Sequence, residues 1–371
     1  MKCFKDGAIV KTVKHDGHTN LYYPRIHDIF IDHEKEAVRF TFTLKNGMNP
    51  ELVTKNFWVF KQTFGEHIEI SGKYKEFTLW AYSKGMPTSI SYQFDEIEGK
   101  MKDKVVPLVL GYDQRGELLV LCLKELHHVL LTGSTGSGKS TLFRSMITSL
   151  ILHKRPEEIQ LVMADFKKSE FGIYRHLPHV KRVHMEPTTF LVELLNIQKE
   201  MKRRGDLLDQ YDLDHVSELE EKLPIIMIVI DELFELTDNK AIMNILTKIS
   251  ALGRSAQIHI LAAMQSGRAA DLGGQFLNNM NCRISGKQAD QTNAKVAGLS
   301  TTKDISVPGR MALSIHGEES QVQVPYINKQ KAKKLLEPFK IKKVEDPNAF
   351  VEIEESSILE DKVNEFIIGG D

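Results

Sequence analysis

Residues 133–141 form a glycine-rich run, Gly-Ser-Thr-Gly-Ser-Gly-Lys-Ser-Thr, whose residue types suit the binding of phosphate groups. The spacing Gly-x-x-x-x-Gly-Lys-Ser is typical of a phosphate-binding loop, in which glycines let backbone N–H groups point at a phosphate. Lys139 would reach the β- and γ-phosphates as a point charge, and the Ser140 hydroxyl would hold Mg²⁺. We therefore predict that a nucleoside triphosphate binds to Gly133, Ser134, Thr135, Gly136, Ser137, Gly138, Lys139, Ser140 and Thr141.

The sequence on either side of this loop predicts the elements that must position it. An apolar run, Val129–Leu131, precedes the loop and is typical of a buried strand. After the loop, apolar residues recur at helical spacing at Leu142, Phe143, Met146, Ile147, Leu150 and Ile151. A strand, a glycine loop and a helix in this order are the context that the motif requires, and a helix N-terminus also favours anions. This context disfavours the alternative that the loop binds nothing.

Two adjacent acids follow a second buried strand. The run Pro224–Ile230 is continuously apolar, as strands covered on both faces of a parallel sheet are, and it ends at Asp231 and Glu232. Asp231 is predicted to hold Mg²⁺ together with Ser140. Glu232 is predicted to polarise the attacking water as a general base. The second acid favours a hydrolase over a nucleotide-binding switch.

Polar residues also end two further predicted strands, at 159–165 and 258–264. Because α/β sheets bind ligands at the carboxyl edge of their strands, both ends are candidates for the site. Gln265 is interpreted as a contact to the γ-phosphate or to the lytic water, with an ordinary strand end as the equal alternative. The group 165–168, Asp-Phe-Lys-Lys, is interpreted as coupling the nucleotide state to a moving loop, or as an ordinary strand-ending turn.

Three domains are expected. Residues 1–104 indicate a small α+β domain with strands near 29–31, 37–44, 68–70 and 77–82 and one helix over 50–64, to which we assign no chemistry. Residues 105–327 would form the nucleotide-binding domain, in which a hairpin over 105–121 leads into the first strand. Residues 328–371 are rich in lysine and then in acids, which is typical of a flexible, solvated tail. A partner-docking segment and a mimic of DNA charge are its alternatives.

Two other features of the nucleotide-binding domain leave alternatives open. Tyr112 is either a contact to the adenine or an ordinary packed tyrosine. A basic cluster ends a predicted helix over 188–209 and contains Lys199, Lys202, Arg203 and Arg204. It would meet phosphates of DNA or of a neighbour's nucleotide, or else form a solvated helix end that the helix dipole favours.

Composition narrows the class of protein. The net charge is −1 and 27% of residues are charged, so no global field points to nucleic acid or membrane, and local patches must serve such partners. Three scattered cysteines, Cys3, Cys122 and Cys282, argue against a disulfide framework. No apolar run is long enough to span a bilayer, and the N-terminus does not resemble a signal peptide. We therefore expect a cytoplasmic protein.

The order of these motifs resembles the FtsK/SpoIIIE family of DNA translocases. The resemblance depends on Gly133–Ser140, Asp165-Phe166-Lys167, Asp231-Glu232, Arg254 and Gln265, and on the landmarks Leu110-Gly111, Glu200-Met201-Lys202-Arg203, Arg254-x-x-x-Ile258-His259 and Asn281-x-Arg283-Ile284. It spans about residues 105–326 and is strongest for the compact coupling ATPases of plasmids and conjugative elements. Two departures are visible, because the family has Asp-Pro-Lys at 165–167 and Arg-Pro after the residue equivalent to Gln265.

The resemblance implies an α/β fold, with a RecA-like P-loop ATPase core and a mainly parallel sheet preceded by the small α+β domain. It implies ATP and Mg²⁺ as ligands, and a ring, a homo-hexamer, with nucleotide at its interfaces and double-stranded DNA in its pore. Arg254 matches the position of an arginine that acts across the interface, with Arg283 as second choice and a structural salt bridge as the alternative for each. Lys139, Glu232 and Gln265 complete the catalytic set. Lys168 and Arg268 are the nominated DNA contacts.

The leading hypothesis is therefore an ATP-driven motor that translocates double-stranded DNA in plasmid or mobile-element transfer, replication or segregation. Its partner would be a relaxase, a replication initiator or a secretion-channel protein. Three alternatives remain: a protein-exporting motor of the type VII secretion kind, a single-stranded DNA translocase or helicase, and a non-hydrolysing interaction module.

Overall fold

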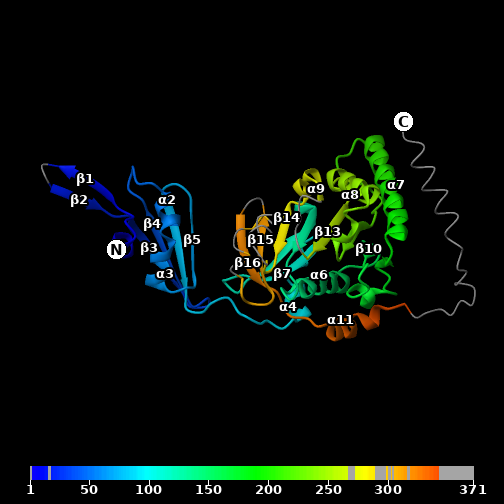
Figure 1. The fold of residues 1–371 in the computed structure, drawn as a ribbon, viewed down its shortest axis with the longest axis horizontal. Helices are drawn as coiled ribbons and strands as arrows, with labels where there is room; N and C mark the ends of the chain where they lie inside the picture. Colours follow the sequence, from blue (N-terminus) through cyan, green and yellow to red (C-terminus); the bar gives the residue numbers. More distant parts are fainter. Residues whose placement is uncertain are drawn as a thin grey trace, which may run out of the picture.

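The structure is a computed structural model that describes residues 2–15, 18–265, 272–288, 298–299, 302, 305–315 and 318–341. Two units are visible in Figure 1, a small N-terminal unit and a larger unit that we call the α/β unit. Within the described residues, no helix has the length and apolar content that crossing a bilayer requires.

The N-terminal unit is built on an antiparallel sheet in the order β3 (Arg25–Asp32), β4 (Ala37–Thr43), β6 (Glu76–Tyr82) and β5 (Ile68–Gly72). The helices α1 (Lys2–Asp6), α2 (Glu51–Lys55) and α3 (Phe57–Phe64) and a hairpin of β1 (Lys11–His15) and β2 (His18–Tyr22) complete it. The buried rings of Phe4, Phe42, Phe60 and Phe77 pack together as its core.

The predicted strands of this unit are present, but the single helix predicted over 50–64 is wrong. The helix is broken at Asn56, where φ is −103° and ψ is 28°. Asparagine competes with helical hydrogen bonding more than most residues do, so the apolar periodicity on either side does not require one continuous helix.

The α/β unit contains a sheet of ten strands. Their order is β11 (Val180–His184), β10 (Ile159–Ala164), β12 (Ile225–Ile230), β13 (Ile258–Met264), β9 (His128–Thr132), β14 (Cys282–Ser285), β15 (Arg310–Ile315), β16 (Glu318–Gln323), β7 (Pro107–Tyr112) and β8 (Leu118–Cys122). From β11 to β14 all neighbours are parallel, and from β14 to β8 all are antiparallel. The predicted α/β core is confirmed, and its parallel part carries the motifs.

Helices cover both faces of the parallel strands. On one face, α6 (Lys139–His153) packs on Val129 and Leu131 of β9. On the other face, α7 (Pro187–Tyr211) and α8 (Lys240–Leu252) pack with Leu130 of the same strand. This alternation is the two-residue period of a strand that is buried on both sides. Smaller helices are α4 (Phe94–Glu98), α5 (Leu123–Leu126) and α9 (Gly274–Asn279).

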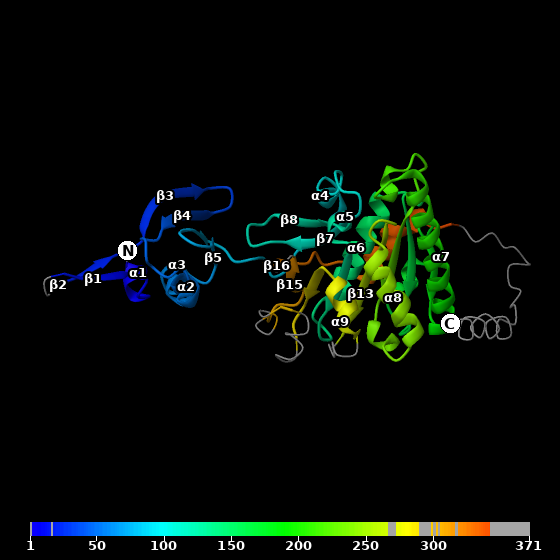
Figure 2. The same cartoon turned by 90° about the horizontal axis from the view of Figure 1, so that it is seen from above.

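The chain between β6 and β7 joins the two units. Tyr92, Ile97 and Met101 belong to the core of the α/β unit, so we propose that the boundary lies near residue 90 rather than at 104. Figure 2 shows the β7–β8 hairpin reaching toward the turn between β3 and β4. There Lys35 Nζ lies 2.8 Å from Glu117 Oε1, an exposed ion pair between the two units.

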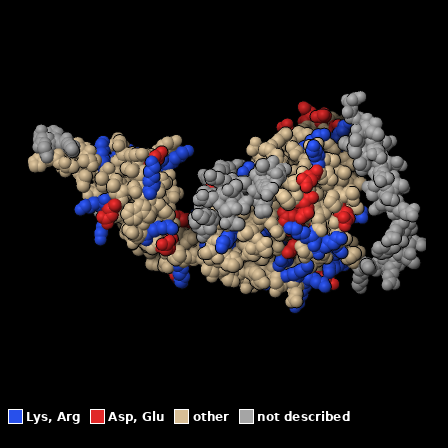
Figure 3. Space-filling view, in the orientation of Figure 1, with Lys and Arg blue, Asp and Glu red and all other residues tan. Residues whose placement is uncertain are grey.

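The prediction of a flexible tail from residue 328 is wrong for its first part. Residues 329–336 form α11, whose first turn is capped by the Asn328 side chain, and residues 337–339 add a 3₁₀ turn. Ala332 and Leu336 are buried in the core of the α/β unit beside α6, while lysines occupy the outer face, over which Figure 3 shows basic side chains gathered. An amphipathic face of this kind orders a charged segment. Residues 342–371 lie outside the described residues.

Candidate active site

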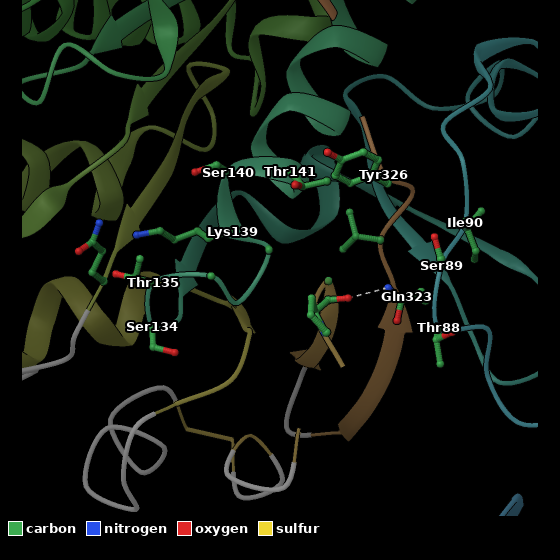
Figure 4. A pocket seen from close by; sticks show the side chains of 16 residues that line it. Thr88, Ser89, Ile90, Ser134, Thr135, Lys139, Ser140, Thr141, Gln323 and Tyr326 are labelled. Atoms are coloured by element: carbon green, nitrogen blue, oxygen red, sulfur yellow. Dashed lines mark hydrogen bonds between the residues drawn. The ribbon is translucent and has the colours of Figure 1, made fainter. Parts of the chain in front are cut away.

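The carboxyl ends of β9, β10, β12 and β13 meet at one edge of the sheet, and the predicted motifs follow these ends. A cavity of about 470 Å³ opens there (Figure 4). It is lined on one side by the loop after β9 and by Gln265, and on the far side by residues from three other segments. The loop residues that line it are Ser134, Thr135, Gly136, Gly138, Lys139, Ser140 and Thr141.

The glycines of the loop are needed for its backbone path. Gly136 has φ +81° and Gly138, immediately before α6, has φ +103°, a region that other residues rarely adopt. A Cβ atom on Gly138 would lie 2.6 Å from the Cα atom of Gly309, so only glycine allows these two backbones to approach. The loop therefore turns tightly into the N-terminus of α6, the geometry that favours an anion.

Lys139 places its ammonium group in the pocket with little water around it. Its exposed fraction is 8%, and burial lowers its pKa, against the attraction of Glu232 and Asp231. Within the described residues its Nζ atom makes no hydrogen bond and no ion pair within 4 Å. A desolvated cation without a close partner of its own is suited to a phosphate group.

Asp231 and Ser140 supply the oxygen atoms that a divalent cation would require. Asp231 is buried, and burial raises its pKa to about 6 although Lys139 opposes the shift. Within the described residues no group of three or more His, Cys, Asp or Glu side chains could hold a metal ion. Mg²⁺ is usually held by one or two carboxylates together with substrate phosphates and water. One buried carboxylate and one hydroxyl therefore fit Mg²⁺ better than a metal that needs a full protein cage.

Glu232, the predicted general base, is 3% exposed and both of its oxygen atoms accept hydrogen bonds. Lys167 Nζ donates to Oε2 at 2.8 Å, and the backbone N–H of Gln265 donates to Oε1 at 3.2 Å. Burial disfavours the charged form of Lys167, but the hydrogen bond to Glu232 and the attraction of the nearby carboxylates together outweigh it, and the pKa of Lys167 is raised. The structure thus brings Glu232, Gln265 and Lys167 together, whereas the sequence analysis gave Lys167 no role of its own.

The loop after β10 is held by Asp165. This carboxylate is buried and accepts the backbone N–H groups of Ser169, Glu170 and Phe171 at 3.0, 3.1 and 2.8 Å. Lys168, a nominated DNA contact, is exposed on this loop and lies 3.5 Å from Glu186. Arg268, the other nominated contact, lies outside the described residues.

Arg254 lies at the opposite edge of the sheet, just before β13. Seven residues of strand separate it from Gln265, roughly 23 Å, so it cannot reach the pocket of its own subunit. Arg283 instead donates to the carbonyl oxygens of Leu277 and Met280 at 2.8 and 3.4 Å, which ties β14 to α9. The exposed Arg254 is therefore the better candidate for an arginine that acts on a neighbour.

The basic cluster on α7 divides in the structure. Arg204 is 1% exposed and donates to Glu200 at 2.8 Å, to the Ala256 carbonyl at 2.7 Å and to the Pro224 carbonyl at 2.8 Å. Its interpretation as a phosphate contact is therefore wrong. Arg203, beside it, is half exposed and pairs only with Glu200 within the described residues.

The far wall of the cavity was not found from the sequence. It consists of three segments, 88–90, 308–309 and 323–326, and Figure 4 shows Thr88, Ser89, Ile90, Gln323 and Tyr326 across from the loop. The first and last segments pair, because Tyr326 donates its N–H to Ile90 and accepts the N–H of Tyr92 at 2.6 and 3.1 Å. Tyr326 is 58% exposed on the side of Thr141, whereas Tyr112 is not among the lining residues. No local pattern relates segments so distant in the chain.

Known proteins share this core. The profile of the FtsK/SpoIIIE family matches residues 94–223. The DNA translocase FtsK of Staphylococcus aureus (strain Mu50) is 31% identical over 233 residues, 58% of this chain and 30% of that protein. The DNA translocase FtsK of Helicobacter pylori (strain J99) is 30% identical over 272 residues, 69% of this chain and 32% of that protein. The chain thus spans about a third of the length of these relatives.

Solved structures extend the likeness in fold. The pCW3 conjugation coupling protein TcpA, a monomer form with ATPγS, aligns with a TM-score of 0.62 at 22% identity, over 91% of this chain and 98% of that one. The cytoplasmic domain of the Thermomonospora curvata type VII secretion ATPase EccC aligns with a TM-score of 0.56 at 22% identity, over 64% and 31%. The first alignment is long enough to include the N-terminal unit.

Proposed function

The chain belongs to the FtsK/SpoIIIE family, and from this premise we propose that it is an ATP-hydrolysing motor that binds and moves double-stranded DNA. The observation that carries the proposal is that Lys139 and Ser140 line the cavity while the buried Asp231 and Glu232 lie close enough to attract the charge of Lys139. A phosphate loop, two oxygen donors for a cation and a buried glutamate are the parts that triphosphate hydrolysis requires.

The triphosphate would lie along residues 133–141. Lys139 would neutralise the β- and γ-phosphates, and its desolvation strengthens that attraction. Ser140 and Asp231 would hold Mg²⁺, which when bound supplies positive charge to the phosphates. The nucleoside end would then point toward Tyr326 and residues 88–90, where an exposed aromatic ring offers a stacking surface.

Glu232 would act as the general base. It accepts a proton from water while the water oxygen forms a bond to the γ-phosphorus and the bond between that phosphorus and the β–γ bridging oxygen breaks, which yields ADP and phosphate. Gln265 would orient the water or the γ-phosphate, because it lines the cavity and its backbone N–H contacts Glu232.

We further propose that identical subunits form a ring, a homo-hexamer, in which Arg254 of one subunit approaches the nucleotide of the next. The position of Arg254 at the edge opposite its own pocket supports this geometry. A cation supplied across an interface in this way accelerates hydrolysis by ~10³ to 10⁵ in other phosphoryl-transfer enzymes.

DNA would lie in the pore of that ring. Lys168 and Arg268, on the loops after β10 and β13, are the proposed contacts. Such contacts to phosphates make binding tolerant of sequence and steeply dependent on salt. The likeness to a conjugation coupling protein supports a role in plasmid or mobile-element transfer, with a relaxase, a replication initiator or a secretion-channel protein as partner.

The deciding experiment measures ATP hydrolysis with double-stranded DNA, with single-stranded DNA and without DNA. Stimulation by double-stranded DNA is expected, and Glu232→Gln should reduce the rate about 100-fold or more while DNA binding is retained. Mass measurement with a slowly hydrolysed ATP analogue gives the number of subunits. If DNA leaves the rate of ATP hydrolysis unchanged, the motor proposal is contradicted. If single-stranded DNA stimulates hydrolysis more strongly than double-stranded DNA, the substrate is single-stranded DNA.

The fold likeness to the type VII secretion ATPase supports a second candidate function, a motor for protein export. Hydrolysis in that case would respond to a peptide and not to DNA. The same assay with a peptide substrate of the secretion type in place of DNA distinguishes the two.

A further inference from the structure

The carboxylate of Glu232 is held from two sides. Its Oε2 atom accepts the ammonium group of Lys167 at 2.8 Å, and its Oε1 atom accepts the backbone N–H of Gln265 at 3.2 Å. The second contact keeps Glu232 beside the pocket. The first places a full positive charge on the oxygen that would otherwise be free to take a proton from water, and a charge-assisted hydrogen bond of this length is among the stronger ones in proteins.

Lys167 can reach Glu232 because of the register of the sheet. β10 and β12 are parallel neighbours with Ala164 opposite Ile230, so the chain segments that follow these two strands run side by side. The two partners differ in their access to solvent. The Lys167 side chain is 36% exposed, whereas that of Glu232 is almost fully buried. A ligand at the surface can therefore reach the lysine without entering the pocket.

The loop that carries Lys167 is anchored on both sides of this residue. Asp165 holds the backbone of Ser169, Glu170 and Phe171. The Glu170 side chain pairs with Arg144 of α6 at 3.3 Å. Only residues 166–168 lie between these anchors, and a change at Lys167 requires rotation of a side chain rather than movement of the loop.

The residue that follows Lys167 has a strained backbone. Lys168 has φ +57°, in the left-handed region that a residue with a side chain rarely adopts. Such strain persists where the surrounding structure imposes it, and it is frequent at functional sites. Here it lies at the turn where Lys167 reaches Glu232 and Lys168 is exposed.

We propose that Lys167 is a positioning residue for Glu232 and links DNA binding to hydrolysis. In the arrangement described here, its ammonium group holds the Glu232 carboxylate in a resting orientation. DNA phosphates at the outer turn compete for Lys167, and Glu232 is then free to accept a proton from the attacking water. The inference depends on the proposed ATPase function and deepens it by naming the contact through which DNA acts.

The charges involved favour DNA phosphates over Glu232 as partners of Lys167. Double-stranded DNA carries one negative charge per ~1.7 Å of its axis, so a lysine at its surface meets several phosphates, whereas Glu232 offers one carboxylate. Lys168, exposed beside Lys167, would hold the phosphates close to the turn. Without DNA, Lys167 is the one ion-pair partner of the buried Glu232 within the described residues, so the lysine returns to it.

The test compares three variants of the full chain. Lys167→Met removes the charge and keeps the length of the side chain, and Lys167→Arg keeps the charge. Lys181→Met is the matched control, because Lys181 forms an ion pair of the same length, 2.8 Å, with Glu193 of α7 and does not line the pocket. Hydrolysis is measured for each with and without double-stranded DNA, together with the thermal midpoint and the affinity for a fluorescent ATP analogue.

Lys167→Met is expected to raise the DNA-free rate about tenfold, toward the stimulated rate, and to bring the ratio of the two rates close to one. Lys167→Arg and Lys181→Met should keep the ratio of the original protein. The double variant Lys167→Met/Glu232→Gln should be as slow as Glu232→Gln alone, because Lys167 acts through that carboxylate. A merely structural ion pair would change the thermal midpoint and leave the ratio intact.

Two results would overturn the inference. One is a folded Lys167→Met protein that binds the analogue and has the DNA-free rate and the ratio of the original protein. The other is a DNA-free rate that falls, which would make Lys167 a supporting partner of Glu232 rather than a restraint. If DNA fails to stimulate the original protein, the proposed motor function fails separately. A higher DNA-free rate in Lys167→Met would still support the restraint, and an unchanged rate would still exclude it.

Discussion

The α/β unit buries two cationic side chains at opposite edges of one sheet, and they differ in their hydrogen bonding. Lys139 lies at the carboxyl edge and is 8% exposed, and Arg204 lies at the amino edge and is 1% exposed. Burial lowers the pKa of both side chains. Arg204 is satisfied by a carboxylate and two carbonyl oxygens, whereas Lys139 has no hydrogen-bond partner within the described residues.

The difference separates a structural charge from a functional one. A buried cation with its hydrogen bonds made joins the segments that accept them, here α7 and the residues before β12 and β13. A buried cation without close partners is a cost to the folded state that a phosphate ligand offsets. The acids beside the two cations differ in the same way. Two arginines lower the pKa of Glu200 at the amino edge, whereas burial raises the pKa of Asp231 at the carboxyl edge.

The largest expected effect concerns Arg254, the exposed arginine at the amino edge. Arg254→Ala should lower hydrolysis in the assembled protein by ~10³ or more, because no subunit can supply the charge from its own chain. The measurement is the rate in mixtures of Arg254→Ala with Glu232→Gln. Each variant retains the residue that the other lacks, so a mixed assembly can contain complete sites. The hydrolysis rate of the mixture should therefore exceed the sum of the rates of the two variants alone. A mixture equal to the sum would show that Arg254 does not act between subunits.

Replacing the unsatisfied cation should separate activity from stability. Lys139→Ala is expected to lower hydrolysis about 100- to 1000-fold, which is typical of the loss of one charge-stabilising group. The free energy of unfolding should stay the same or rise, because an uncompensated buried charge is removed. Rates and urea denaturation check the two parts. A clear loss of stability would mean that Lys139 also has a structural role.

Replacing the satisfied cation should have the reverse result. Arg204→Met is expected to lower the free energy of unfolding by about 3 kcal/mol, because two buried carbonyl groups and Glu200 lose their partner. Arg203→Met is the matched control, since that side chain is half exposed and pairs only with Glu200 within the described residues, and its cost should stay below about 1 kcal/mol. Urea denaturation of both variants measures the two changes in the free energy of unfolding. Equal changes would contradict the prediction.

The smallest expected effect is the pH dependence of the arginine-rich edge. The hydrogen bond from Arg203 and then that from Arg204 lower the pKa of Glu200 to about 2, from its ordinary value of 4.5. A carboxylate with a lowered pKa in the folded state stabilises the protein above its unfolded pKa, and this stabilisation is lost as the pH falls from about 4.5 toward 2.

The size of this effect is small because Glu200 is partly exposed and solvent screens it. The stability difference between the original protein and Glu200→Gln should be about 1 kcal/mol at pH 7 and should shrink below pH 4.5. Urea midpoints between pH 7 and pH 3 measure it. A difference that stays constant over this range would mean that the pKa of Glu200 is not lowered.

The amino-acid sequence by itself determined the chemistry that lies within short stretches. The spacing of residues 133–140, the apolar strand before Asp231 and Glu232, and the polar ends of the neighbouring strands predicted which residues meet, because the carboxyl ends of parallel strands share one edge. The family resemblance rested on the same motifs. The predicted strands are present because a continuous apolar run between turn residues has few other stable conformations.

Only the tertiary structure decided how residues far apart in the chain are paired. The sequence did not distinguish Arg204, which is buried against two carbonyl groups, from Arg203, which faces solvent, because that depends on which loops pack on α7. The lysine-rich sequence of α11 predicted a flexible tail, because such a helix is ordered only by the core on which it packs. The bond between Lys167 and Glu232 depends on β10 lying beside β12. Sheet order and register arise from packing over the whole domain, which no local period encodes.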